Sequence, residues 1–187
     1  VGVAGDITAA ELGPLLDKAF AGLPKTAGAV DVPAATLRNG GETVVIERPV
    51  PQSVALFGEK GIPRKDPDWY AGQVVNYVLG GGGFNSRLME EIREKRGLAY
   101  GVSTGISPYD KASVLMGQVA TQNARVAESL DLVRQEWKRM AEEGPTQEEL
   151  DDAKTYLIGS FPIGLDSTGS IAATLVGMAV HRGEAAV

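Results

Sequence analysis

Residues 85–100 constrain the fold most, because they encode a short helix, the turn that ends it and a strand, one directly after another. Apolar residues recur at helical spacing in the first part, and the cations of its last turn suit the negative end of a helix dipole. Gly97 supplies the left-handed residue that terminates such a helix. The spacing therefore predicts that Arg93, near the helix end, and Tyr100, at the strand start, are held near one another on rigid elements.

The remaining segments alternate between strand-like and helix-like patterns. Strands are expected over residues 42–48 (with the run Thr43-Val44-Val45-Ile46), 52–60, 98–106 and 113–120. Helices are expected after the capping box of Thr8 with Glu11, from Asp66 as N-cap, over 85–95, over 124–143, after the capping box of Thr146 with Glu149, and over 167–180 as a buried helix. This order predicts an α+β domain, with helices layered on one face of a largely antiparallel or mixed sheet.

The chain also shows signs of two parts. Residues 1–5 have the pattern of the end of a buried strand, with no earlier strand to pair with, so we expect the chain to be a piece of a longer protein. Residues 25–41 are rich in Ala, Gly and Pro without sustained periodicity, which is typical of a linker. A second unit is expected to begin at residue 42.

Composition excludes several kinds of site. The chain of 187 residues has no cysteine, which excludes disulfides, a thiolate nucleophile and cysteine-ligated metal. Its single histidine, His181, excludes a self-contained site with two imidazole ligands, and we expect a partly exposed side chain at a helix end. A formal net charge of -6 disfavours nucleic acid as a partner, and no apolar run approaches the ~20 residues of a membrane-spanning helix.

Four consecutive glycines, residues 80–83, allow three interpretations. They could cradle a phosphate, but no Gly-Lys-Ser/Thr follows them and Asn85 stands where a dinucleotide motif requires glycine. They could end a helix in a flexible turn, which the pattern favours. They could also form a mobile loop that touches an extended peptide, in which case Gly81, Gly82 and Gly83 would bind substrate.

Arg93 and Tyr100 also have two interpretations. A guanidinium fork and a phenol held together suit recognition of a peptide carbonyl or a developing oxyanion. Periodicity alone instead favours a solvated helix face and a half-buried strand tyrosine. A surface position is likewise expected for the neighbouring Arg87 and Arg96.

These residues resemble the second-domain signature of the pitrilysin/insulinase-type zinc peptidases, the inverzincins, and most closely their mitochondrial-processing-peptidase-like branch. In that family a helix ending in Arg-Glu-Lys-x-Gly-Leu-Ala-Tyr carries an arginine and a tyrosine, which correspond to Arg93 and Tyr100. Further matches run in order along nearly the whole chain: Val3-Ala4-Gly5-Asp6, Arg48-Pro49, Pro51-Gln52-Ser53, Asp66-Pro67-Asp68, Leu79-Gly80-Gly81, Ser86-Arg87-Leu88 and Gly144-Pro145-Thr146.

The resemblance implies two homologous α+β domains facing one another, of which one binds zinc through His-x-x-Glu-His and the other offers the arginine and tyrosine. This chain has no His-x-x-Glu-His. It therefore resembles the metal-free domain (residues 42–187, C-terminally shortened), preceded by the last strand and helix of the other (1–24) and a linker (25–41).

The implied function is that of a non-catalytic half of a zinc metalloendopeptidase, inactive alone, with zinc in another domain or subunit. Arg93 and Tyr100 would bind an unfolded peptide substrate and stabilise the transition state. The expected partner is the zinc-binding homologous domain or subunit, as a homo- or hetero-dimer, with no nucleic acid and no membrane. The alternative is a structural or assembly subunit without peptidase activity. The compartment stays open between bacterial cytoplasm and periplasm.

Overall fold

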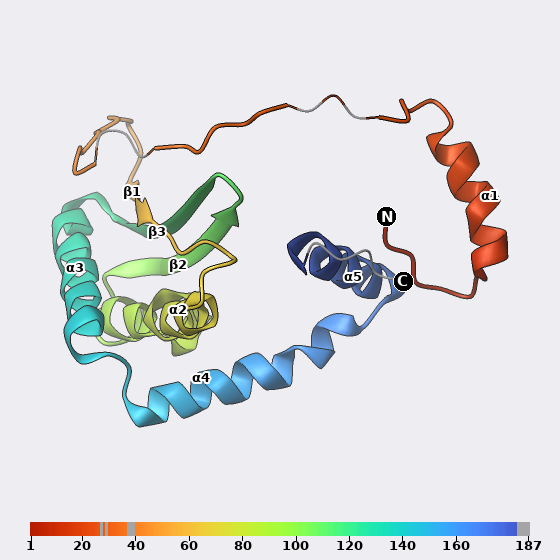
Figure 1. Cartoon of the computed structure of the whole chain (residues 1–187). Helices are drawn as coiled ribbons and strands as arrows, with labels where there is room; N and C mark the ends of the chain where they lie inside the picture. The colour runs from red at the N-terminus through yellow and green to blue at the C-terminus, as the bar shows by residue number, and fades with distance from the viewer. Residues whose placement is uncertain (27, 29, 37–39, 183–187) are drawn as a thin grey trace. The chain divides into compact units, whose positions relative to one another are not determined.

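The computed structural model describes residues 1–26, 28, 30–36 and 40–182, with only the backbone for residues 181 and 182 (Figure 1). The predicted partly exposed side chain of His181 lies outside the described residues. The chain divides into two compact units, one formed by Val1–Val32 with Leu157–Val187 and the other by Pro33–Tyr156. The predicted boundaries at 24 and 41 between homologous domains stay a prediction.

The unit Pro33–Tyr156 contains a three-stranded antiparallel sheet. Its strands are β1 (Gln52–Lys60), β2 (Ala99–Tyr109) and β3 (Ala112–Gln122), arranged in the order β1-β3-β2. β2 and β3 form a hairpin, and β1 pairs with the other side of β3, so β1 and β2 are the two edge strands of the sheet that the described residues form. The predicted α+β class and the three strands at 52–60, 98–106 and 113–120 are confirmed.

Two predicted strands are wrong. Residues 42–48 form no strand, and Val44, Val45 and Ile46 are 74–77% exposed. Residues 1–5 form none either, and a Cβ at Gly2 would overlap Val176. A β-branched or apolar run becomes a strand only when another strand supplies hydrogen bonds, and neither segment joins the described sheet.

Helices cover one face of the sheet. The chain runs from α2 (Trp69–Asn76) through a π-helical turn η1 (Tyr77–Gly81) and a short 3-10 turn η2 (Gly83–Asn85) into a second π-helical turn η3 (Met89–Glu94). After the hairpin, the 3-10 turn η4 (Asn123–Arg125) leads into α3 (Val126–Glu143). Leu88, Ile92 and Val119 are fully buried where these helices meet the sheet. The N-cap of α2 is Asp68 rather than the predicted Asp66.

The two faces of the sheet differ sharply. On the covered face Val102 and Val119 are at most 3% exposed. On the open face Val54 is 64% and Leu56 is 69% exposed, and the register aligns Val54 with Ala120 and Gly101 across the three strands. The open face therefore presents the apolar Val54 and Leu56 on β1, Ala120 and the polar Gln118 on β3, and small residues on β2.

Helix α4 (Gln147–Ser160) follows α3 after Gly144, whose φ is 71°. Its predicted capping box forms: the Thr146 amide donates to Glu149 Oε2 at 2.7 Å, and the Glu149 amide donates to Thr146 Oγ1 at 3.2 Å. The same carboxylate accepts from Arg87 Nη2 at 2.6 Å, so Glu149 joins the α4 start to the chain just before η3.

The other unit contains α1 (Ala9–Phe20), a 3-10 turn η5 (Pro162–Leu165) and α5 (Thr168–Arg182). The predicted capping box of Thr8 with Glu11 is present at the start of α1. The expectation that helix 167–180 is buried is wrong, since Leu175, Met178 and Val180 are 41–67% exposed. No single helix of the described chain is long and apolar enough to cross a membrane. The helices at 147–165 and 168–180 reach that length and composition only when taken together, and they are bent by 119° at the break between them.

Candidate functional site

The predicted helix at 85–95 ends in a widened turn that carries Arg93. The Lys95 amide donates to Glu90 O at 2.9 Å, a π-type bond between residues five apart. Gly97, with φ 59°, then donates to Arg93 O at 2.9 Å, and Leu98 donates to Ile92 O at 2.9 Å. The last two bonds join residues four and six apart, whereas the corresponding bonds of a Schellman motif join residues three and five apart. The predicted role of Gly97 as the left-handed terminator is confirmed.

Tyr100 is the extra residue of a β-bulge. Ala99 pairs with Thr121 and Gly101 with Ala120, so Tyr100 has no partner on β3. Because of this insertion, Ala99 and Val102 both face the buried side, although they are three residues apart. The Tyr100 side chain is left 60% exposed. Bulges often redirect a side chain beside a binding site, and this one turns the phenol out of the strand's regular alternation.

The guanidinium of Arg93 rests on an aromatic ring. Its Cζ lies 4.6 Å from the centre of the Phe84 ring, which is within the range of a cation–π contact. Its Nη1 also lies 3.2 Å from the Glu94 carboxylate, and the side chain is 35% exposed. In the described part of the chain, no hydrogen bond joins Arg93 to Tyr100. Both groups are accessible, so neither is sealed in the core.

The neighbouring cations are already paired. Lys95 and Arg96 both contact the Glu91 carboxylate, at 2.6 and 2.5 Å, and their hydrogen bonds lower the pKa of Glu91. Arg96 is 41% exposed, as expected. The expectation of a surface position for Arg87 is wrong: Arg87 is 5% exposed and forms a two-pronged ion pair with Glu149. Arg93 is thus the cation of this helix end that turns toward the Gly83-Phe84 loop.

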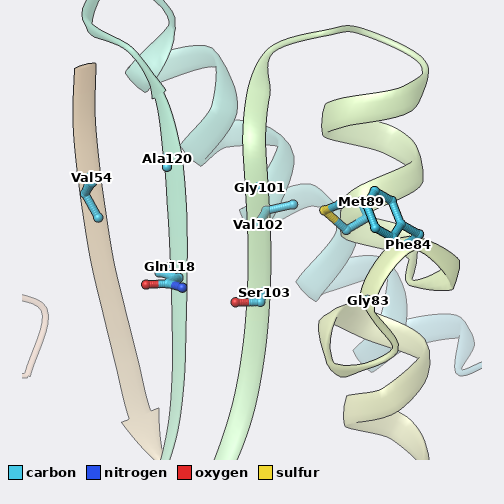
Figure 2. A pocket seen from close by; sticks show the side chains of 9 residues that line it. All are labelled: Val54, Gly83, Phe84, Met89, Gly101, Val102, Ser103, Gln118 and Ala120. Carbon is cyan, nitrogen blue, oxygen red and sulfur yellow. The ribbon is translucent and has the colours of Figure 1, made fainter. Parts of the chain in front are cut away.

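A groove of about 330 Å³ opens beside β2 (Figure 2). Figure 2 shows Phe84 and Met89 on the helical side of the groove, with strand residues on the other. None of its lining residues carries a charge: Val54, Gly83, Phe84, Met89, Gly101, Val102, Ser103, Gln118 and Ala120. Neither predicted site residue lines it, but each is next to a residue that does: Tyr100 directly precedes Gly101, and Arg93 contacts the Phe84 ring.

The fold itself requires glycine at three positions of the run, Gly81, Gly82 and Gly83. A Cβ at Gly81 would lie 2.5 Å from Asn76 Nδ2, and a Cβ at Gly82 would lie 2.7 Å from Tyr77 O. Gly83 has a φ of 59°. Of the three glycines predicted to bind substrate, Gly83 lines the groove, whereas Gly81 and Gly82 do not. A substrate-binding role for Gly81, Gly82 and Gly83 stays a prediction.

Sequence reasoning missed Phe84 and Met89. Phe84 is 67% exposed in the turn η2, and the signal that the sequence offered was an aromatic residue directly after four glycines. Met89 follows the helical spacing of core residues and is 7% exposed, so its pattern does not distinguish a groove wall from ordinary packing. The bulge at Tyr100 has no local sequence signature.

The described residues offer no metal site. Among them, no three His, Cys, Asp or Glu side chains gather in a group that could hold a metal ion. A zinc ion therefore does not fit this part of the chain, and the site has uncharged groove walls with one arginine and one tyrosine at its border.

Comparison with known proteins places these features in a family. Residues 1–157 match the Peptidase M16 inactive domain. An uncharacterized zinc protease of Streptomyces coelicolor is 35% identical over 136 residues, which cover 73% of this chain and 29% of that protein. The non-peptidase homolog YmxG of Helicobacter pylori is 37% identical over 127 residues, covering 67% of this chain and 29% of that protein. The chain thus spans less than a third of these relatives.

The fold agrees with this match. The crystal structure of a peptidase M16 inactive domain from Pseudomonas fluorescens has a TM-score of 0.80 and 34% identity, covering 95% of this chain and 42% of that chain. The predicted resemblance to the metal-free domain of the pitrilysin/insulinase-type zinc peptidases is confirmed. This chain therefore belongs to the peptidase M16 zinc protease family and carries its inactive domain.

Proposed function

We propose that this chain is the non-catalytic half of a zinc metalloendopeptidase, and that it holds a peptide substrate through Arg93 and Tyr100. The zinc and its water belong to a homologous domain with His-x-x-Glu-His, in the same polypeptide or in a partner subunit. This chain contributes contacts to the substrate backbone near the scissile bond. Its substrate is an unfolded peptide, since a backbone in extended form can enter an open groove.

One observation supports the proposal most strongly: each of the two residues is next to a residue that lines the same uncharged groove. Arg93 lies on the ring of Phe84, and Tyr100 precedes Gly101 at the bulge. Phe84 and Gly101 both line the groove. Neither Arg93 nor Tyr100 lines the groove itself, and the proposal rests on their each being next to a residue that does.

The chemistry of the two groups suits this task. A guanidinium offers five N–H donors in a planar fork, and a fork of this kind can hold peptide carbonyls. A phenol donates one hydrogen bond, which gains strength as negative charge develops on the carbonyl oxygen under attack. The Tyr100 bulge and the glycine-terminated helix hold the two groups on rigid backbone, so little ordering is required when substrate binds.

Mixing experiments test the proposal. Peptide hydrolysis is measured for this chain alone, for the His-x-x-Glu-His half alone, and for the mixture, with and without a chelator. We expect hydrolysis from the mixture and none from this chain alone. A catalytic half that works equally well without this chain would contradict the proposal.

Removing the phenol oxygen of Tyr100 tests the role of this residue. Tyr100→Phe in the complete enzyme is expected to lower turnover by on the order of 10²–10³, the usual cost of losing an oxyanion donor, with unchanged zinc content. Tyr109→Phe is the matched control, because Tyr109 is a tyrosine on the same strand with 65% exposure. Equal turnover of the Tyr100 and Tyr109 variants would remove Tyr100 from the mechanism.

A second candidate function is that of a structural or assembly subunit without peptidase activity. The 37% identical relative in Helicobacter pylori is named a non-peptidase homolog, which favours this alternative. The two candidates differ in the mixing experiment. An assembly subunit would stay bound to its partner after both Arg93→Ala and Tyr100→Phe, and no combination with the partner would hydrolyse peptide.

A further inference from the structure

We infer that the groove beside β2 binds one bulky uncharged side chain of an extended peptide, and that Phe84 determines this preference. The inference rests on the proposed function and adds a specificity to it. Its observations are the polarity of the lining, the open Cβ position of Gly101 on β2, and the contact between Arg93 and Phe84.

The lining selects an uncharged side chain. The nine lining residues include no ionisable group, and their polar side chains are those of Ser103 and Gln118. A charged side chain would lose its hydration there without gaining an opposite charge. Small-molecule pockets span about 300–1,000 Å³, so a groove of about 330 Å³ suits one large side chain better than a cofactor.

Gly101 leaves room that the chain itself does not use. No atom of the described structure lies within 4 Å of a Cβ built at Gly101, and its φ is not positive, so neither packing nor backbone strain requires glycine there. A glycine in a strand without such a reason is typical of close approach by a ligand or another backbone. Gly101 lies on an edge strand and lines the groove, so the approaching backbone is that of an extended peptide beside β2.

Arg93 positions the wall of the groove. Phe84 is 67% exposed, and the guanidinium of Arg93 lies 4.6 Å from its ring centre. This contact restrains an exposed ring that projects from the turn η2. The groove is therefore continuous with the proposed substrate contact, and the side chain beside Phe84 belongs to the peptide segment that Arg93 holds.

A binding experiment with the full 187-residue chain tests the inference. The probes are blocked peptides Ala-Thr-Ser-Xaa-Ser-Thr-Ala in which Xaa is Phe, Leu, Ala or Glu. Amide shifts in NMR spectra report where each peptide binds. We expect the Phe and Leu peptides to shift the amides of Gly83, Gly101 and Ser103, and to bind about 10-fold more tightly than the Ala peptide, with the Glu peptide weakest.

Matched variants test whether the peptide preference depends on the groove and not on other positions of the sheet. Gly101→Val is expected to abolish the preference by filling the groove. Gly105→Val is the control, because Gly105 lies on the same strand with no atom within 4 Å of its Cβ position, yet does not line the groove. Phe84→Ala is expected to reduce the preference for Phe over Ala to less than about 3-fold, whereas Leu56→Ala on the open face leaves it unchanged.

Any one of four results would overturn the inference. They are NMR shifts confined to other amides, a peptide preference that survives Gly101→Val, equal effects of Gly101→Val and Gly105→Val, and no peptide binding at millimolar concentration. Concentration-dependent shifts at the same amides without peptide would assign the groove to a second copy of the chain. The proposed function is judged separately: if the mixture hydrolyses peptide and Tyr100→Phe slows it, that function stands even when the groove shows no preference.

Discussion

The ion pair between Arg87 and Glu149 is the most buried ion pair in the described chain, and its removal gives a quantitative test. Arg87 is 5% and Glu149 is 27% exposed. Arg87 Nη2 also donates to Gly144 O at 2.9 Å, so one guanidinium joins the turn before α4 to its first helical turn. Arg87 Nη1 is buried with no partner, which leaves the guanidinium dependent on Glu149.

The size of the effect follows from the pKa of Glu149. The hydrogen bonds from Arg87 lower this pKa from 4.5 to about 2. That difference corresponds to about 3 kcal/mol between the charged and neutral forms of the carboxyl group. Because about a quarter of the Glu149 side chain is exposed to solvent, we expect Glu149→Gln to lower the free energy of unfolding by about 2 kcal/mol.

The pH dependence has a definite sign. The folded carboxyl titrates near 2 and the unfolded one near 4.5, so between these values the unfolded state binds more protons. The stability that the pair contributes is therefore present above pH 4.5 and is lost as the pH falls toward 2. The difference between wild type and Glu149→Gln should be largest at neutral pH and should close across this window.

Urea unfolding followed by tryptophan fluorescence measures the effect, because Trp69 and Trp137 both lie in the unit Pro33–Tyr156. The control is Glu142→Gln, since Glu142 is 62% exposed with only a 3.7 Å contact to Lys138, and should cost less than about 0.5 kcal/mol. The reasoning fails if Glu149→Gln also costs less than that at pH 7, or if its deficit does not change between pH 7 and pH 3.

Three further substitutions test separate parts of the fold. Gly97→Ala should cost about 1 kcal/mol in urea unfolding from backbone strain alone, since φ is 59° and no atom lies within 4 Å of the Cβ position, and Gly97→Asn should cost less. Gly117→Ala should cost about 1–3 kcal/mol because its Cβ would overlap the Phe57 ring, and Phe57→Leu should relieve part of that cost. Thr8→Ala should weaken the start of α1 by about 1 kcal/mol, measured as faster amide exchange there; unchanged exchange would contradict the capping box.

Elements with local signals could be predicted from the sequence. β1 runs over the predicted residues 52–60, because its apolar alternation has turn residues on both sides. Both capping boxes form as predicted, since a capping box joins residues three apart. Gly97 ends its helix as predicted, because the left-handed conformation depends on that residue alone.

Features that depend on distant partners could not be predicted. Val44–Ile46 has the composition of a strand, but pairing is decided by other strands. Arg87 lies in a charged helix, and its burial depends on Glu149, far away in the chain. The π-helical turns and the Tyr100 bulge each insert one residue, a change that shifts every later side chain without altering composition. Met89 at the start of η3 and Gly101 after the bulge both line the groove, so its walls could not be predicted from the sequence.

A double-mutant cycle on Arg93 and Tyr100 tests the central claim most directly. The value of kcat/KM is measured for the complete enzyme, for Arg93→Ala, for Tyr100→Phe and for the double variant. If both groups hold the same peptide segment, the double variant loses less than the product of the single losses, with a coupling of at least about 0.5 kcal/mol. Losses that multiply within error, or single variants as active as wild type, would show that the two side chains do not act on one substrate.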